Sequence, residues 1–279
     1  MELSLEHHTI LVDEILHSIF FLGQISTPRH SPEDIMNHDQ SLLDALRHYY
    51  PGPFSCYSTQ LPKRSPFSCV LDMVVLVTGQ QNENEIINRL QEFIDERLRG
   101  NQLASSTICV SQRNTAEESV RYYGVSMSTS GRNPGRIIVA ASCLSNWDSY
   151  VADAVMTYYP SRTRKTYFDG TIRLPKRVRC QAISLRRGTL VAPCRSCANL
   201  FGLTTNAEQV WAYGHCAEAE SVSNLLKIDE EVRVQVEQPS ETCTPANRQR
   251  AKASVRTELR RCLGEVGFQW NNHFYNPQV

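Results

Sequence analysis

The sequence predicts an α/β protein, in which a mixed β-sheet with flanking helices follows a helical N-terminal extension. Three observations lead to this prediction. Apolar residues recur at helical spacing near the N-terminus, nearly continuous apolar runs follow them, and helical and strand patterns alternate through the rest of the chain. The chain has 279 residues and a hydrophobic content of 41%, which is enough to bury a substantial core.

Two helices are expected in the N-terminal extension, residues 1–60. The first carries an apolar face at helical spacing, made by Leu11, Ile15, Ile19 and Leu22. The second begins at Ser31-Pro32, a capping residue followed by proline at the first helical position, and runs to Tyr50. Pro51-Gly52-Pro53 is expected to end it.

A β-α-β segment packed on the core is predicted for residues 61–115. Its first strand is 70–77, a nearly uninterrupted apolar run that indicates a central position in a sheet. A helix over 82–98 places Ile86, Leu90, Phe93 and Ile94 on one face, and a strand at 107–110 completes the unit.

The third predicted domain covers residues 116–279. Strands are expected at 121–128, 136–141, 178–185, 189–192, 208–213 and 231–237. Helices are expected at 145–159, after Pro193, from Gly214 to Leu226, and from about Pro245 to Cys262, the last being basic.

Charge and hydropathy argue against membrane and strongly polyanion-binding classes. The 29 basic residues balance 29 acidic ones, and the N-terminus lacks the basic start of a signal peptide. The apolar segment 10–25 contains Asp13, Glu14 and His17, so it is too short and too charged to cross a bilayer. We therefore expect a cytoplasmic protein without a membrane partner, with the nucleus as the alternative compartment. In a reducing compartment, most of the ten cysteines are expected to be buried apolar residues.

Three cysteines have the spacing of metal ligands. Pro193-Cys194-Arg195-Ser196-Cys197 offers two thiols from one turn, and Cys216-Ala217-Glu218 offers a third. Both motifs start predicted helices, whose N-termini favour the thiolate form that a metal needs. The sequence therefore predicts a zinc ion bound by Cys194, Cys197 and Cys216.

Glu218 is the predicted catalytic residue of this site. Three protein ligands and one open position are typical of catalytic zinc, which lowers the pKa of bound water to about 7. A carboxylate two residues beyond Cys216 is placed to transfer a proton at that position. Glu220, four residues beyond Cys216, is the alternative carboxylate. Glu218 is favoured because it is only two residues beyond Cys216 in the sequence.

These motifs resemble those of the zinc-dependent cytidine and deoxycytidylate deaminase superfamily, whose members combine His- or Cys-x-Glu with Pro-Cys-x-x-Cys. Residues 213–226 also resemble animal proteins, especially from fish. The resemblance implies a deaminase-like zinc domain that removes an exocyclic amine from a nucleobase, with a nucleotide or a single-stranded nucleic acid as substrate. In the family the Glu motif precedes the Pro-Cys-x-x-Cys helix, whereas here it follows. If the elements are read in the order found in the family, the predicted helix 145–159 takes the position of the helix that carries the Glu motif. This position offers Cys143 but no Cys-x-Glu motif.

Two alternatives stay open from the sequence. A fourth ligand, His215 or Cys143, would close the site and make the protein a non-catalytic, zinc-stabilised interaction module. The chain would otherwise be a deaminase-like protein that has lost activity. Arg162, Arg164 and Lys165 lie among aromatic residues, a mixture found on base-stacking surfaces, although ordinary loop composition is the favoured interpretation.

Overall fold

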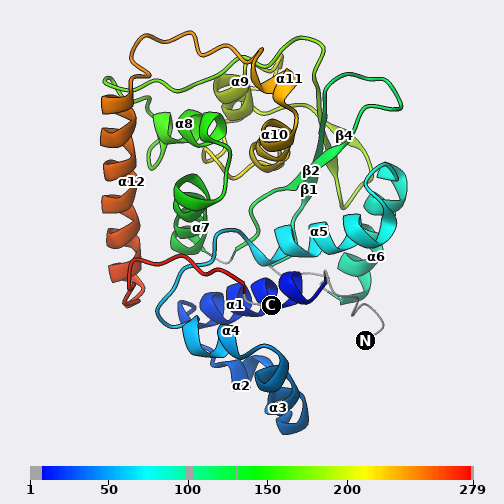
Figure 1. Cartoon of the computed structure of the whole chain (residues 1–279), viewed down its shortest axis with the longest axis vertical. Coiled ribbons are helices and arrows are strands. Elements are labelled where there is room, and N and C mark those ends of the chain that lie inside the picture. Colours follow the sequence, from blue (N-terminus) through cyan, green and yellow to red (C-terminus); the bar gives the residue numbers. More distant parts are fainter. Residues whose placement is uncertain (1–7, 98–102, 130, 278–279) are drawn as a thin grey trace.

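The computed structural model of the chain describes residues 8–97, 103–129 and 131–277, and consists of helices around a small antiparallel sheet (Figure 1). The helices are α1 (His8–Gln24), α2 (Pro32–Ile35), α3 (Gln40–Tyr49), α4 (Pro51–Cys56), α5 (Pro66–Thr78), α6 (Glu83–Arg97), α7 (Arg132–Ser145), α8 (Ser149–Tyr158), α9 (Arg195–Phe201), α10 (Ala217–Ile228), α11 (Glu230–Arg233) and α12 (Pro245–Glu265). The strands are β1 (Thr107–Gln112), β2 (Tyr122–Val125), β3 (Arg179–Ser184) and β4 (Leu190–Val191). The predicted α/β class is confirmed at this level, but the predicted mixed sheet is wrong, because the four strands described pair only in antiparallel fashion.

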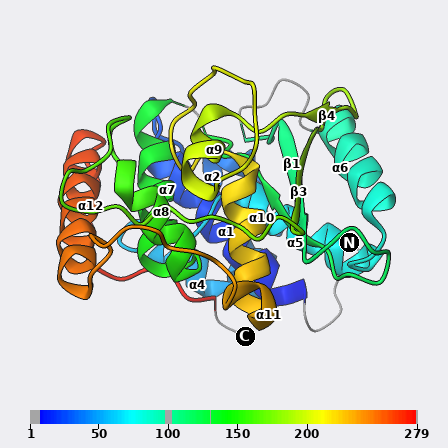
Figure 2. The same ribbon diagram turned by 90° about the horizontal axis from the view of Figure 1, so that it is seen from above.

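The sheet is the central layer between two sets of helices. Its strand order is β2-β1-β3-β4, every neighbouring pair is antiparallel, and Cys109 of β1 lies opposite both Gly124 and Ala182. Because side chains alternate along a strand, Ile108 and Val110 pack with apolar residues of α5 and α6. Cys109 and Ala182, on the opposite face, meet Ala217 of α10. Figure 2 shows α10 and α6 on the two sides of the sheet.

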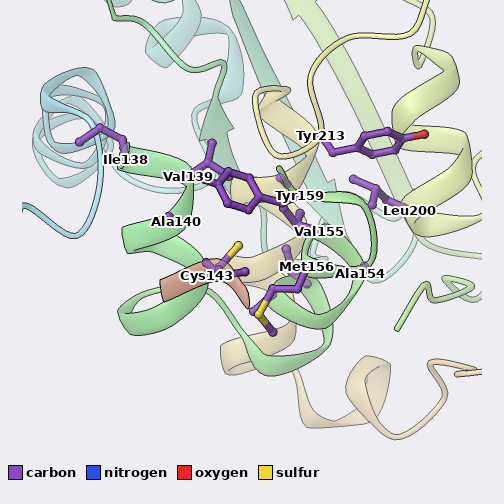
Figure 3. Packing of buried hydrophobic residues seen from close by; sticks show 14 of the residues in the cluster. Ile138, Val139, Ala140, Cys143, Ala154, Val155, Met156, Tyr159, Leu200 and Tyr213 are labelled. Atoms are coloured by element: carbon purple, nitrogen blue, oxygen red, sulfur yellow. The ribbon is translucent and has the colours of Figure 1, made fainter. Parts of the chain in front are cut away.

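A second core lies among the helices beyond α10. Buried side chains of α7, α8 and α9 interlock there, among them Val139, Val155 and Leu200 (Figure 3). Helix α1 contributes Phe21 and α12 contributes Leu259, so the N- and C-terminal helices share this core. No helix within the described ranges has both the length and the apolar character needed to cross a membrane.

The predicted strand 70–77 is wrong, because these residues lie within α5. Ser65 caps this helix by accepting a hydrogen bond from the Ser68 backbone, Pro66 occupies the first turn, and Gly79 follows the last turn with φ of 91°. A continuous apolar run fits a buried helix as well as a buried strand. The Ser-Pro start and the glycine end are helix signals that decide between the two.

Three further strand predictions fail for related reasons. Residues 136–141 belong to α7, which is buried from Ile137 to Cys143, so its apolar run is not interrupted by exposed polar residues. In 231–237 the chain forms α11, which Asp229 caps, and only Glu237 makes a β-bridge, with Arg173. Residues 208–213 form no strand and run as loop between α9 and α10.

The N-terminal extension is helical as predicted, but its second helix is interrupted. Asn37 and His38 have positive φ values, 51° and 56°, and separate α2 from α3. Pro51 begins α4 instead of ending the helical region. The predicted helices 82–98 and 245–262 correspond to α6 and α12, although Leu98 lies outside the described residues.

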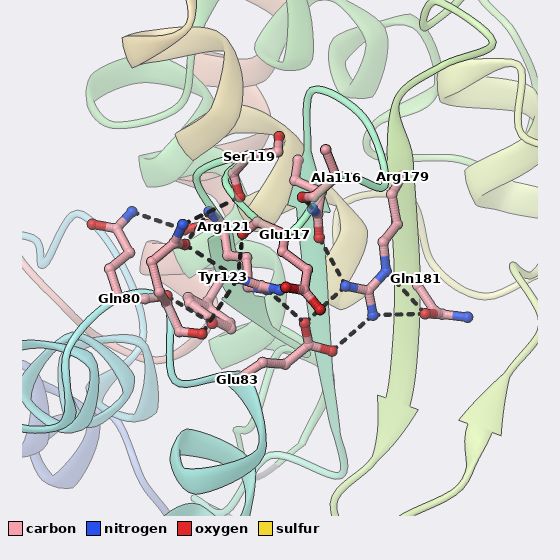
Figure 4. A network of polar contacts seen from close by, with 11 residues as sticks. Gln80, Glu83, Ala116, Glu117, Ser119, Arg121, Tyr123, Arg179 and Gln181 are labelled. Carbon is pink, nitrogen blue, oxygen red and sulfur yellow. Dashed lines mark hydrogen bonds and ion pairs between the residues drawn. The ribbon is translucent and has the colours of Figure 1, made fainter.

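An ion-pair network holds α6 to the sheet. Glu83 at the start of α6 binds Arg121, beside β2, at 3.1 Å and Arg179 of β3 at 2.7 Å (Figure 4). Arg179 also donates a hydrogen bond to Gln181. The single carboxylate thereby bridges two arginines from distant segments.

Gly124 of β2 is the point at which α10 comes closest to the sheet. A Cβ atom at this position would lie 2.2 Å from the Ser221 backbone nitrogen and 2.7 Å from the Ala217 carbonyl oxygen. Both contacts are with backbone, which cannot rotate away as a side chain can. Only glycine allows this separation between β2 and α10.

We predict that Gly124→Ala destabilises the protein by about 3 kcal/mol or more, because the added methyl group must push α10 away from β2. Urea unfolding measures the change. Gly264→Ala is the matched control, since a Cβ at that position in α12 meets nothing within 4 Å. It should stabilise the helix by up to about 1 kcal/mol, and equal effects of the two substitutions would contradict the packing described here.

Candidate metal centre

Cys194, Cys197 and Cys216 form one compact cluster of thiols. The Cys194 sulfur lies 3.6 Å from that of Cys197 and 3.4 Å from that of Cys216. The three sulfur atoms are all within 4.8 Å of one another. The structure therefore brings together the two motifs that are eighteen residues apart in the sequence.

Two helix N-termini build this cluster. Cys194 is the N-cap residue of α9 and Cys216 is the N-cap residue of α10, each with extended backbone. Neither thiol makes the capping hydrogen bond that Ser or Asp would make at this position, so both sulfur atoms are available to the cluster. Cys197 lies within the first turn of α9, so it faces the same point.

The contacts between the sulfur atoms make Cys194 the most acidic thiol of the cluster. Hydrogen bonding with the thiols of Cys197 and Cys216 holds the pKa of Cys194 far below that of an ordinary cysteine. The contact with Cys194 raises the pKa values of Cys197 and Cys216. The three thiols therefore differ in acidity, although they lie at one point.

The donor set fits a tetrahedral metal ion. Zinc–thiolate bonds of about 2.3 Å place the sulfur atoms of a tetrahedral site roughly 3.8 Å apart. The sulfur–sulfur distances of 3.4 and 3.6 Å in the cluster are close to this value. Soft thiolate ligands select zinc, copper(I) or iron over hard cations such as magnesium. The three cysteines could therefore hold a soft metal ion with little movement.

Glu218 lies beside the cluster, in the first turn of α10. The residue is 4% exposed, and its carboxylate lies beside the Cys197 thiol. Burial raises the pKa of Glu218 above that of a free glutamate. The structure thus places the predicted catalytic carboxylate in direct contact with one of the predicted ligands.

Glu220 points away from the cluster and has a structural partner. Its Oε2 accepts a hydrogen bond of 2.8 Å from the backbone N–H of Val125 in β2. The Val125 amide lies on the strand at the edge of the sheet, where β1 is the only neighbouring strand. Burial raises the pKa of Glu220 to about 7.

His215 and Cys143 lie outside the thiol cluster. The His215 ring packs against α7, where its Cε1 lies 2.7 Å from the position that a Cβ of Gly135 would take. Cys143 is buried in the helical core, and burial raises its pKa. Within the described part of the chain, no His, Asp or Glu joins the three cysteines as a further ligand.

An open pocket leads to the cluster. It has a volume of about 880 Å³ and is lined by Cys194, Cys216 and Glu218, while Cys197 lies beneath them and is buried. The remaining walls come from the end of β2, the β3–β4 turn and the loop that precedes α10. A fourth ligand position on this side would face a volume typical of small-molecule sites.

Comparison with protein-family models, curated proteins and solved structures finds no match for this chain. The functional interpretation therefore depends on the residues and geometry of the site.

Several residues that line the pocket belong to no motif that the sequence analysis identified. Trp211 lines it and is 56% exposed, which is unusual for tryptophan. Arg186 and Arg187 line it from the β3–β4 turn, and Ser126 from the end of β2. From the sequence alone, an apolar residue such as Trp211, which lies between two helix starts, cannot be distinguished from a core residue.

We predict that Glu220→Gln changes the pH dependence of stability. A carboxyl group whose pKa rises from 4.5 to about 7 on folding stabilises the protein fully below pH 4.5, and this contribution is lost as pH rises through 7. At pH 8 the variant should be more stable than the wild type by about 3 kcal/mol, because its amide keeps an acceptor for Val125 without charge.

Urea unfolding at pH 5 and pH 8 measures this difference, which should shrink towards the lower pH. Comparing the two proteins at each pH cancels every other titrating group. A difference that is constant across the range would mean that Glu220 is ionised in the folded protein at all these pH values.

Proposed function

We propose that this protein is a zinc-dependent hydrolytic deaminase that acts on a nucleobase. The observation that supports the proposal most directly is the open pocket over the three-cysteine cluster, with Glu218 in its wall. A structural zinc site is closed by four protein ligands, whereas a catalytic one leaves a position for water and substrate. The resemblance of the two cysteine motifs to the cytidine deaminase superfamily specifies the chemistry.

The reversed order of the motifs is compatible with this proposal. A metal ion is bound by sulfur atoms at the right positions, whatever their order along the chain. Here α9 and α10 bring both motifs to one point, each from a helix N-terminus. The arrangement in space has the same components that the family signature contains: three ligands and one adjacent glutamate.

In the proposed reaction, water replaces the exocyclic amine of the base and ammonia leaves. A zinc ion bound by the three thiolates would supply water that ionises near neutral pH. The Glu218 carboxylate accepts one proton of the attacking water and passes it to the ring nitrogen, and then transfers the second proton of that water to the departing amine, which leaves as ammonia. Burial of Glu218 excludes competing bulk water from these transfers.

The first prediction from the proposed function concerns the zinc content of the protein. The wild type should contain about one zinc per chain, and Cys197→Ser and Cys216→Ser should each lose it, because two thiolates and a hydroxyl bind zinc weakly. Elemental mass spectrometry of purified proteins measures the ratio. Cys56→Ser is the control, since Cys56 lies outside the cluster. Wild-type protein without zinc, after reconstitution under reducing conditions, would refute the proposal.

The second prediction separates the enzyme from a non-catalytic zinc module. Glu218→Gln should keep its zinc and lose at least about a hundredfold in turnover, because an amide cannot transfer the proton. Ammonia release from cytosine- and adenine-containing nucleosides, nucleotides and single strands measures activity. Glu208→Gln, an exposed glutamate in the α9–α10 loop, is the control. Zinc-loaded wild type with no activity on any of these compounds would favour the module.

A further inference from the structure

Four arginines line the candidate site without an ion-pair partner among the residues that the structure describes. They are Arg132, Arg162, Arg186 and Arg187, and all four side chains are exposed. Some other arginines of this electrically neutral chain are paired, as Arg121 and Arg179 are with Glu83, and others, such as Arg256 and Arg260 of α12, are unpaired within the described residues but line neither pocket. An unpaired group of this size beside a pocket is therefore available to an anionic ligand.

The arginines belong to two adjoining pockets. Arg186 and Arg187 line the pocket of the cysteine cluster, whereas Arg132 and Arg162 line a second pocket of about 630 Å³. Ala212 and His215 line both pockets, so the two spaces meet beside the start of α10. The arginine pairs consequently lie in two adjoining pockets, together called the hollow.

Almost no negative charge opposes these arginines within the hollow. Of the described residues that line either pocket, Glu218 is the single acidic one, and it is buried. Arg136 also lines the second pocket, but it is paired with Glu258 at 3.1 Å. Basic side chains therefore outnumber acidic ones in the lining of the two pockets.

Trp211 provides an aromatic surface in the pocket of the cysteine cluster. It immediately precedes Ala212, which lines both pockets, and its side chain is 56% exposed. Its backbone is held by the Ser196 hydroxyl, which donates a hydrogen bond of 2.7 Å to the Trp211 carbonyl oxygen. An exposed indole in a pocket that is also lined by cationic side chains is a typical stacking platform for nucleobases.

We infer that the joined pockets bind a single-stranded nucleic acid, with one base at Glu218, a neighbouring base on Trp211 and phosphates on both arginine pairs. This inference rests on the proposed function for the position of the reacting base. A free nucleotide carries its phosphates on one side of the sugar, so it would engage one arginine pair and leave the other unused. A chain that passes through both pockets engages the two pairs together.

The test measures binding of a fluorescein-labelled single strand of about 12 nucleotides, as DNA and as RNA, by anisotropy at several salt concentrations. The double variants R132A/R162A and R186A/R187A should each bind about tenfold or more weakly. Each should also reduce the slope of log affinity against log salt by about 1.4, which corresponds to two lost phosphate contacts. Trp211→Ala should weaken binding at least about fivefold.

The matched control is R256A/R260A, which removes the same charge from the exposed face of α12 away from both pockets. It should leave affinity and salt slope unchanged. Equal loss in the control would mean nonspecific attraction and would overturn the inference. It would also be overturned if unlabelled cytidine or adenosine monophosphate competed as well as the unlabelled strand, or if no strand bound. The comparison of DNA with RNA identifies which polymer is preferred.

These outcomes are distinct from failure of the proposed function. Binding that depends on both arginine pairs, without zinc or ammonia release, would refute the deaminase and support the nucleic-acid site. Ammonia release from free nucleotides, unaffected by R132A/R162A, would support the deaminase and overturn the single-strand inference.

Discussion

The contact between the backbone of α10 and the backbone of β2 is the constraint on which the rest of the structure depends. It requires glycine at position 124, where any side chain would collide with Ser221. Two polar contacts hold α10 to the sheet: Glu220 accepts from the Val125 amide of β2 at 2.8 Å, and the hydroxyls of Ser111 in β1 and Ser221 are 2.9 Å apart. Because α10 cannot shift along the sheet, the cysteine and glutamate at its N-terminus are held in place.

The position of α9 depends on the loop that joins it to α10. Within this loop the Gln209 carbonyl accepts from the Arg195 amide at 2.9 Å, and the His215 carbonyl accepts from the Met127 amide at 2.8 Å. Tyr213 stacks on Tyr158 of α8 with ring centroids 3.9 Å apart. These contacts hold the loop, and with it the starts of α9 and α10, against the sheet and the helical core (Figure 2). The candidate metal centre is therefore formed by helices and a loop whose positions are fixed by hydrogen bonds and packing.

Local patterns predicted some elements of the fold well and others poorly. Helices α1, α6 and α12 have strong periodicity or capping signals, and the structure confirms them. The runs 70–77 and 136–141 are helical, although their apolar composition favours strands. Residues 137–141 are buried, whereas in 70–77 the apolar run continues into exposed residues, with Leu76 48% and Val77 41% exposed, so neither run shows the alternation that separates a strand from a helix. Burial by distant segments is decided by tertiary packing, which a short window of sequence does not contain.

The sequence by itself determined the chemistry of the candidate site: two cysteine motifs at helix starts and a glutamate two residues beyond the third cysteine. These are local features, since capping position and spacing within one helical turn follow from neighbouring residues. Only the tertiary structure decided that Glu220 binds β2, that His215 faces α7, and that unpaired arginines surround an open pocket. Each of these depends on segments far apart in the chain, whose approach is set by the packing of α10 on the sheet and of α7 on the helical core.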